Sequence, residues 1–260
     1  MDGKYATDLT DEQWHLIRRF LPPASNVGRP RTVCRRRVID AVLYVVRTGC
    51  QWRMLPHDFP KWRTVYKLYW EWQLRGVWER IHDALRARVR GAEGRKAAPS
   101  AAIIDSQSVK TTEAGGPRGY DGGKKVVGRK RHLAVDTLGL ILAVVVHPAD
   151  VQDYDGARLV LEQLHRRFQR LKVIFADSAY GRNGLPQWVQ YTLGCVLQTI
   201  LRPVATKGFV VLPKRWIVER TFAWLSRCRR HAKDHERTTR SSVAMIQIAM
   251  IQLMTRRLTN

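Results

Sequence analysis

Three carboxylates stand out in a chain whose other conspicuous stretches are basic or apolar. Asp105 and Asp177 each follow a short apolar run and each begin the same dipeptide, in "IIDS" and in "FADS". Glu219 is the single acid in "RWIVERTFAWL". Three such acids together can hold two Mg²⁺ ions, because Mg²⁺ prefers oxygen ligands. Two metals roughly 4 Å apart can activate an attacking hydroxyl and stabilise a leaving oxygen, which is the chemistry of phosphoryl transfer.

Each acid also has an ordinary structural explanation. An aspartate after a strand is common in turns and helix caps. Glu219 could form an ion pair with Arg215, one helical turn earlier, on a solvated helix face. That order of base before acid is the weaker one, and such pairs contribute only about 0.3–0.5 kcal/mol. Two identically placed aspartates shift the balance towards a functional role.

The stretch around Glu219 is expected to form a long helix over residues 213–234, with a proline near its start. At 100° per residue Glu219 lies away from the apolar face and close to Arg215. Trp216 and Trp224 lie eight residues apart on one side of this helix. Core packing is the favoured interpretation of the two tryptophans, and stacking on an unpaired base is the alternative. The apolar face comprises Ile217, Val218, Thr221, Phe222 and Leu225.

Strands alternate with helices from residue 101 onwards, which predicts a mixed α/β sheet with helices on both faces. Asp105 and Asp177 are expected at strand ends, where ligand chemistry gathers in open α/β sheets. A glycine-rich turn or flexible loop is expected after the first strand, and a hairpin after that. The expected strands are 101–105, 124–136, 139–147, 172–177 and 195–203, and the expected helices are 153–168, 185–194, 213–234 and 241–258.

The N-terminal third reads as helical throughout. A capping box, Thr10 with Gln13, begins the first helix, and Pro22 ends it. The stretch "GAEGRKAAPS" (91–100) is rich in Gly, Ala and Pro and marks a domain boundary. We therefore expect an all-helical domain over 1–95 and an α/β domain over 96–260. The remaining N-terminal helices are expected over 35–49, 62–76 and 77–90.

The charge balance points to a polyanionic partner. The 260 residues include 46 Lys and Arg against 22 Asp and Glu, a formal net charge of +24. The basic residues are spread along the whole length, which favours nucleic-acid binding, although a structural RNA binder would look similar. The four cysteines form no CxxC pair, so zinc and redox sites are disfavoured and reduced thiols are expected. We see no signal peptide and no apolar run long enough to span a bilayer.

Several stretches resemble one known family over almost the whole chain. "IIDSQSVK", "GRKRHLAVDTLGLILAVVVHPADVQD", "VIFADSAYG" and "RPVATKGFVVLPKRWIVERTFAWLSRCRR" are similar to the catalytic core of insertion-sequence transposases of the IS5 family, within the IS4-like DDE group. "TGCQWRMLPHDFPKWRTVYKLYWEW" and "WERIHDAL" resemble the helical N-terminal part of the same proteins.

The resemblance implies an RNase H-like fold of five strands flanked by helices, and a catalytic and metal-binding triad of Asp105, Asp177 and Glu219. It implies Mg²⁺ as cofactor, with Mn²⁺ as a substitute, and cut-and-paste chemistry on transposon ends. Water would attack first at the element's end, and the freed 3′-hydroxyl would then attack target DNA. The group's third motif reads Tyr, two residues, Arg, three residues, Glu, six residues, Lys. Arg215 and Glu219 fit this motif, whereas Leu212 stands at its Tyr position and Ser226 at its Lys position.

DNA contacts are expected in both domains. The N-terminal helices could form a helix-turn-helix that reads inverted repeats, or an ordinary bundle. The loop "GRPR" could enter a minor groove or be a solvated linker, and "GRKRH" is expected to follow phosphates near the active site. The predicted DNA-binding residues are Arg29, Arg31, Arg129, Lys130, Arg131, Arg215, Arg220 and Arg227, the last in place of the motif's missing lysine.

The sequence therefore predicts a DNA transposase that binds terminal inverted repeats and catalyses Mg²⁺-dependent strand cleavage and strand transfer. We expect double-stranded DNA as its partner, a homodimer in the DNA complex, no membrane association, and a place in the bacterial cytoplasm with the nucleoid. Two alternatives remain open: a catalytically silent DNA-binding repressor of the element, and an RNase H-fold nuclease without strand transfer.

Overall fold

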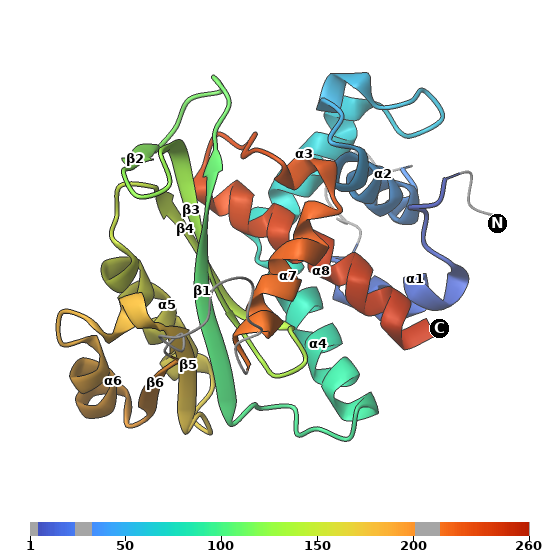
Figure 1. Cartoon of the computed structure of the whole chain (residues 1–260). Coiled ribbons are helices and arrows are strands. Elements are labelled where there is room, and N and C mark those ends of the chain that lie inside the picture. Colours follow the sequence, from blue (N-terminus) through green and yellow to red (C-terminus); the bar gives the residue numbers. More distant parts are fainter. Residues whose placement is uncertain (1–4, 24–32, 201–213, 260) are drawn as a thin grey trace. The chain divides into compact units, whose positions relative to one another are not determined.

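The chain divides into two compact units. A computed structural model describes residues 5–23, 33–200 and 214–259 (Figure 1). The first unit comprises Met1–Glu93, Arg227–Ala232 and Ala244–Asn260, and the second comprises Gly94–Ser226 and Lys233–Val243. The predicted division into 1–95 and 96–260 differs from these units mainly at the C-terminal end, where two segments group with the N-terminal helices.

The regular secondary structure in the described part of the first unit is all helical. The capping box of α1 is present as predicted, because the Thr10 hydroxyl accepts from the backbone N–H of Gln13 and the Gln13 side chain accepts from that of Thr10. The elements of this unit are α1 (Asp11–Ile17), η1 (Arg18–Phe20), α2 (Arg35–Thr48), η2 (Trp52–Met54), α3 (Trp62–Leu74), α4 (Val77–Ala92), η4 (Arg229–His231) and most of α8 (Thr239–Thr259).

Two hydrogen bonds link α8 to the start of the chain within this unit. The Arg256 guanidinium donates to the Ala6 carbonyl at 2.8 Å, and the Gln13 amide donates to the Thr259 hydroxyl at 3.2 Å. Much of α8 is buried on more than one side, including Met245, Ile248 and Met254. The helical unit thus uses segments from both halves of the chain.

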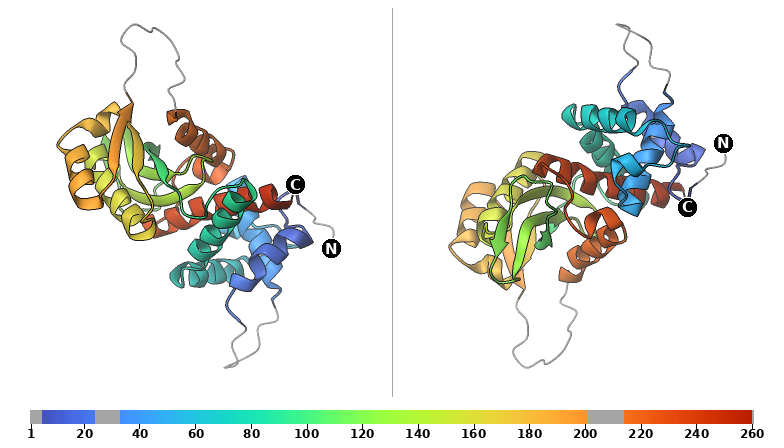
Figure 2. Two further views of the ribbon diagram at one scale, coloured as in Figure 1. Left: turned by 90° about the horizontal axis from the view of Figure 1, so that it is seen from below. Right: turned by 90° about the horizontal axis from the view of Figure 1, so that it is seen from above.

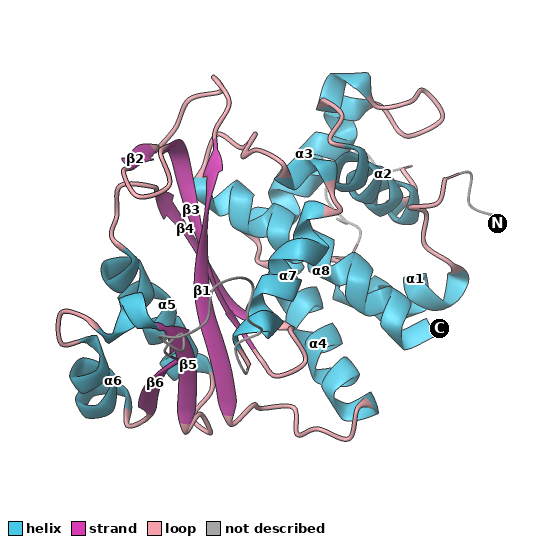
Figure 3. Cartoon of the chain, in the orientation of Figure 1, coloured by secondary structure: helices cyan, strands magenta, loops and turns pink. Residues whose placement is uncertain are grey.

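The second unit is built on one mixed sheet (Figure 3). The strands run in the order β4-β3-β1-β5-β6, with β2 paired to the start of β3. β1 and β4 are antiparallel to β3, whereas β1, β5 and β6 are parallel. The five predicted strands and the predicted mixed sheet are confirmed. The strands are β1 (Ala101–Lys110), β2 (Gly119–Asp121), β3 (Val126–Val135), β4 (Ile141–Pro148), β5 (Val173–Asp177) and β6 (Val196–Ile200).

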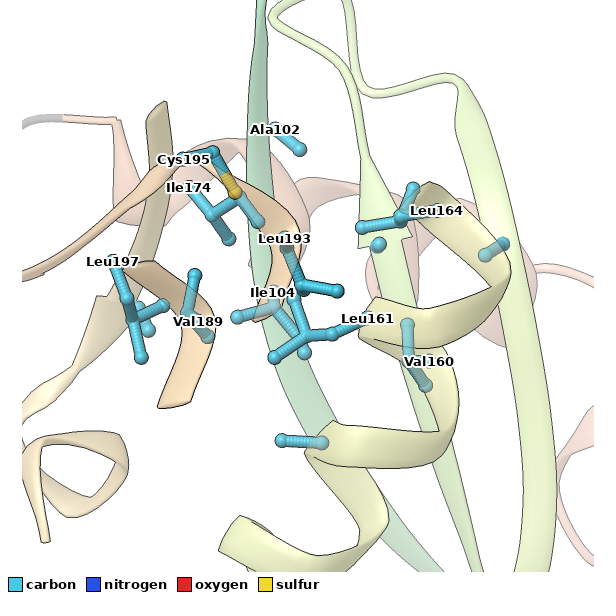
Figure 4. Packing of buried hydrophobic residues seen from close by; sticks show 14 of the residues in the cluster. Ala102, Ile104, Val160, Leu161, Leu164, Ile174, Val189, Leu193, Cys195 and Leu197 are labelled. Carbon is cyan, nitrogen blue, oxygen red and sulfur yellow. The ribbon is translucent and has the colours of Figure 1, made fainter. Parts of the chain in front are cut away.

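Helices cover both faces of this sheet. One face, which we term the α5 face, carries α5 (Asp153–Arg167) and α6 (Leu185–Leu193), and the other, the α7 face, carries α7 (Arg215–Ser226) (Figures 1 and 2). Since neighbouring residues of a strand point to opposite faces, Ala102 and Ile104 join the apolar cluster under α5 and α6, and Asp105 points to the α7 face. Figure 4 shows Leu161, Leu164 and Leu193 of these helices gathered over Ile104 and Ile174.

Three boundaries differ from the prediction. β1 continues past Asp105 to Lys110, because β3 pairs with it along that stretch. The glycine-rich segment expected to be a turn or loop includes the short strand β2. The helix expected to reach residue 234 ends at Ser226, since Cys228 adopts an extended backbone with φ −97° and ψ 110°. A 3₁₀ turn, η4, follows it.

Candidate active site

Asp105 and Asp177 lie side by side on the α7 face. In the parallel pair of β1 and β5, Ile103 is opposite Phe175. Continuing that register by two residues places the two aspartates on neighbouring strands and on the same face. Asp177 ends its strand as predicted, whereas Asp105 lies in the middle of a ten-residue strand. The position of Asp105 is fixed by its pairing with Leu133 of β3 and not by a strand end.

Glu219 reaches the same place from α7. The predicted apolar face of the helix is confirmed by burial. Within that face, the Thr221 hydroxyl donates to the Gly139 carbonyl at 2.8 Å and so attaches the helix to the turn between β3 and β4. Gly139 has φ 80°, and a Cβ there would lie 2.9 Å from the Trp224 ring. Packing and this turn therefore fix the rotation of α7. The Glu219 side chain is 49% exposed and faces the acids on the strands.

One guanidinium nitrogen lies within 4 Å of all three carboxylates. The Nη2 atom of Arg215 is 3.9 Å from Asp105 Oδ2, 3.7 Å from Asp177 Oδ2 and 3.6 Å from Glu219 Oε1. All three distances exceed hydrogen-bond length, so the arginine attracts the three acids without satisfying any of them. The predicted ion pair between Arg215 and Glu219 is thus one part of a four-residue cluster.

Backbone donors hold one oxygen of each aspartate. The N–H of Ser106 donates to Asp105 Oδ1 at 2.7 Å, and the N–H of Ala179 donates to Asp177 Oδ1 at 2.8 Å. In both residues the other oxygen, Oδ2, is the one that faces Arg215. A backbone N–H therefore holds one oxygen of each aspartate, and the second oxygen faces the centre of the cluster.

The electrostatics of the cluster disfavour three ionised acids. The pKa of Asp105 is raised to about 6, chiefly by burial and also by the nearby Asp177, while the Ser106 N–H and Arg215 oppose the rise. The donor set fits a hard divalent cation, because every side chain that converges with Arg215 offers carboxylate oxygens. Among the residues that the structure describes, no three acidic, His or Cys side chains are already spaced around one metal ion, since these oxygens are arranged around the guanidinium.

Three predicted DNA-binding residues are buried. Arg129, Lys130 and Arg131 are 0%, 4% and 2% exposed. Arg129 forms an ion pair with Asp234 at 3.2 Å, and Lys130 forms one with Asp153 at 2.9 Å. Arg131 donates to the Lys233 carbonyl at 3.4 Å. The expectation that these side chains follow phosphates is therefore corrected: they lie inside the second unit, where internal acids and carbonyls take their charge.

Arg220 and the two tryptophans of α7 form a stack. The Arg220 guanidinium lies 4.6 Å from the Trp216 ring centre and 4.7 Å from that of Trp224, and it donates to the Leu138 carbonyl at 3.1 Å. Trp216 is 41% exposed, so the expectation of core packing is wrong for this residue. Burial lowers the pKa of Arg220, and Asp136 opposes that. The side chain is engaged within the protein, and its predicted DNA contact would compete with these interactions.

The remaining predicted positions have mixed outcomes. Arg227 is exposed, and its role in DNA binding stays a prediction. Arg29, Arg31 and Leu212 lie outside the described residues. Ser226, at the family's lysine position, is exposed and donates to the Ala223 carbonyl. The helix-turn-helix interpretation of the N-terminal helices also stays a prediction.

The sequence reasoning missed residues that lie behind the aspartates. Ser106 and Tyr180 follow Asp105 and Asp177 within three positions and join a buried polar network on the α5 face. The alternation of side chains along β1 was the available signal, because a residue next to Asp105 has to point to the opposite face. Their acceptors, on β3 and α5, are far away in sequence and gave no such signal.

All four cysteines are free, as expected, with Cys195 and Cys228 buried. No helix in the described part of the chain has the length and apolar character needed to cross a membrane.

Two family models and two curated relatives match parts of the chain. A family model described as "Transposase DDE domain" matches residues 96–254, more than half of the chain, and one described as "Putative transposase of IS4/5 family" matches residues 9–82. An "Insertion element IS402 uncharacterized 16.2 kDa protein" of Burkholderia cepacia is 35% identical over 114 residues, which are 41% of this chain and 76% of that protein. The "Uncharacterized protein y4sN" of Sinorhizobium fredii is 32% identical over 117 residues, 45% of this chain and 87% of that protein.

Proposed function

Because the chain belongs to the DDE transposases of the IS4/5 family, we propose that it binds the terminal inverted repeats of an insertion sequence and catalyses Mg²⁺-dependent strand cleavage and strand transfer. The observation that carries the proposal is the convergence of Asp105, Asp177 and Glu219 within 4 Å of one cationic nitrogen. Three acids from two strands and a helix have no structural need to meet there, since each could be solvated separately.

Asp105, Asp177 and Glu219 would hold the metal. DDE transposases typically use divalent metal, and Mg²⁺ suits this donor set, with Mn²⁺ as a substitute. When bound, the metal supplies activation of the attacking oxygen and stabilisation of the leaving oxygen in an in-line displacement. The protein supplies orientation: the backbone N–H groups of Ser106 and Ala179 hold each aspartate so that Oδ2 points to the centre.

Arg215 carries two tasks in this proposal. Its guanidinium offsets the mutual repulsion of the three acids before metal arrives, which keeps them together. It lies beside the place where the phosphate of a DNA end would be cleaved, and a guanidinium is well suited to bind phosphate. Arg215 would then exchange its carboxylate neighbours for a phosphate as metal and DNA bind.

The proposal extends to partners and place. Transposition joins two ends of one element, so a complex of two copies with DNA follows from the chemistry. Its substrate is double-stranded DNA, which in a bacterial host places its action at the nucleoid in the cytoplasm.

A cleavage assay on the DNA ends that flank this chain's own coding sequence tests the proposal. The wild type, Asp177→Asn and the control Asp155→Asn are incubated with labelled ends and Mg²⁺. Asp155 is exposed on α5, on the other face of the sheet. We expect cleavage and joining by the wild type and the control, and a loss of roughly a thousand-fold or more in Asp177→Asn, as for residues that act as one catalytic unit.

Other outcomes would favour the alternatives. Retarded DNA without cleavage under Mg²⁺ or Mn²⁺ would overturn the proposal and favour a repressor. Hydrolysed ends that never join target DNA would favour a nuclease. Equal cleavage by Asp177→Asn and the wild type would contradict the assignment of the triad.

A further inference from the structure

A buried polar network lies directly behind the carboxylates, on the α5 face of the sheet. The Tyr180 phenol is 2.7 Å from His132 Nε2, and His132 Nδ1 is 3.3 Å from His147 Nε2. His132 and Tyr180 are 0% and 1% exposed, and His147 and Ser106 are also buried. Most of these groups would be solvated more cheaply at the surface, so their burial in one connected cluster needs an explanation.

The proton positions in this network follow from one carbonyl. His147 Nδ1 is 2.9 Å from the Pro148 carbonyl, which can only accept, so Nδ1 carries the hydrogen. In the neutral ring His147 Nε2 then accepts, so His132 Nδ1 donates to it. His132 Nε2 is left to accept, and the Tyr180 hydroxyl donates. Every hydrogen bond from Tyr180 to Pro148 therefore has one direction.

The His132 and His147 imidazoles and the Tyr180 phenol remain neutral around pH 7. The pKa of His132 is lowered to about 3, chiefly by burial and also by His147. Burial also lowers the pKa of His147, against the opposing hydrogen bond to Pro148. The pKa of Tyr180 is raised well above its ordinary value by burial, with Asp105 and Asp153 adding to the rise. A neutral hydrogen-bonded network with fixed donors is a rigid connection and not a proton switch.

Both catalytic strands are attached to this network. Ser106, next to Asp105, donates to Asp153 at 2.8 Å, and it is the β1 residue paired with His132 of β3. Tyr180 belongs to the 3₁₀ turn η3 (Ser178–Gly181), which begins directly after Asp177. The Tyr180 phenol therefore connects the segment after Asp177 to His132 of β3, and His132 lies opposite Ser106, the residue after Asp105.

Gly156 shows that α5 is shaped around the two imidazoles. A Cβ at this position would lie 2.4 Å from His147 Nε2 and 2.6 Å from His132 Nδ1. A glycine inside a helix costs about 1 kcal/mol relative to alanine. The chain accepts that cost where the helix has to approach both rings.

We propose that Tyr180 and His132 are positioning residues that set the separation of Asp105 and Asp177 from behind the sheet. They touch neither substrate nor metal, and they act through the backbone on which the two acids stand. The inference rests on the proposed function in one respect, namely that the acids hold a divalent cation. Outer partners of metal ligands typically change metal affinity by about 10–100-fold when they are removed.

The test measures Mn²⁺ binding by the full-length chain without DNA, using electron paramagnetic resonance of the free ion. Tyr180→Phe keeps the ring and removes the donor to His132, and we expect a loss of about ten-fold in Mn²⁺ affinity. DNA affinity should stay at the wild-type value, and cleavage should recover as Mn²⁺ is raised. His132→Gln keeps one acceptor and one donor and is expected to bind Mn²⁺ better than His132→Leu.

Ser242→Ala is the matched control. Ser242 is another buried hydroxyl of the second unit, and it donates at 2.7 Å to Asp234, the partner of Arg129. It should lower stability without changing Mn²⁺ affinity. If Tyr180→Phe fails to fold, His132→Leu provides the same test from β3, with the same expected loss.

Two results would overturn the inference. If Tyr180→Phe or His132→Leu destabilises the protein as Ser242→Ala does but binds Mn²⁺ like the wild type, the network has only a structural role. Glu219→Gln separates this from a failure of the proposed function. If Glu219→Gln also binds Mn²⁺ like the wild type, the triad is not the metal site, and both proposals fall.

Discussion

The two faces of the sheet differ in how closely their charged side chains are paired. On the α5 face, Lys130 lies 2.9 Å from Asp153 and 2.9 Å from the Val151 carbonyl, so its charge is fully partnered. On the α7 face, three carboxylates lie 3.6–3.9 Å from Arg215, and none of them is within hydrogen-bond distance of its guanidinium. The first arrangement fixes structure. The second leaves negative charge unsatisfied, which is the property that a cation-binding site requires.

The first prediction concerns the buried ion pair of Lys130 on the α5 face. Lys130→Met should lower the free energy of unfolding by about 3 kcal/mol, because it leaves Asp153 and Asp121 partly buried without their cation. Lys124→Met is the matched control: Lys124 is exposed in the same hairpin and should contribute less than about 1 kcal/mol. Urea unfolding measures both variants.

The same pair of variants tests the correction made for the buried basic residues. Since Lys130 is 4% exposed, its replacement should not change DNA affinity under conditions where the variant remains folded. Equal stability of the two variants, or a selective loss of DNA binding in Lys130→Met, would contradict the contrast between the faces.

The second prediction concerns the α7 face, where removal of a charge should stabilise. Asp105 has an ordinary pKa of 3.8 that rises to about 6 in the folded protein, chiefly through burial. The folded state therefore binds this proton more tightly than the unfolded state. The cost of ionising Asp105 is fully present above pH 6 and disappears as the pH falls towards 4. Without metal, Asp105→Asn should be more stable than the wild type at pH 7 by about 1–3 kcal/mol.

Urea unfolding in EDTA at pH 7 and pH 5 measures this difference, which should shrink at the lower pH. Asp40 of the first unit is the matched control, since burial also raises its pKa to about 6. Asp40→Asn should reduce the pH dependence in the same way. Added Mg²⁺ should stabilise the wild type and Asp40→Asn but not Asp105→Asn. A destabilised Asp105→Asn protein at pH 7 in EDTA would count against an electrostatically strained site.

The smallest effect is expected on the outer side of α7. Arg220, unlike Arg215, has close partners, and Trp216→Ala removes one of its two aromatic neighbours. The expected loss is about 0.5–1 kcal/mol in urea unfolding, the usual value for an exposed cation–π contact. Tyr191→Ala on α6 removes an aromatic side chain that is 88% exposed, and it should change stability by less than about 0.5 kcal/mol. Indistinguishable variants would show that the stack adds no stability.

The sequence predicted the acids better than the bases. Asp177 follows an apolar strand, and Glu219 lies opposite an apolar helix face, so local patterns were enough for both. The apolar pattern of β1 stops at Asp105 while the strand continues, because pairing with β3 and not hydrophobicity extends it. Arg129 and Lys130 were expected at the surface, since basic residues usually are.

The partners of those bases explain why sequence reasoning failed there. Asp234 lies about a hundred positions after Arg129, and Asp153 belongs to a different element from Lys130. Charge composition cannot distinguish a base that meets a phosphate from one that meets a distant acid. The position of α8 had the same difficulty: its apolar pattern predicted a helix but gave no indication of which unit it completes.

That position of α8 has a consequence for the order in which the chain is made. The N-terminal helices emerge first during synthesis, but the segment Ala244–Asn260 that groups with them is translated only after the whole second unit. At typical elongation rates this delay is roughly ten to thirty seconds. The sheet and α7, which carry the three acids, can therefore fold while the helical unit is still incomplete, so the N-terminal helices are among the last segments to reach their final packing.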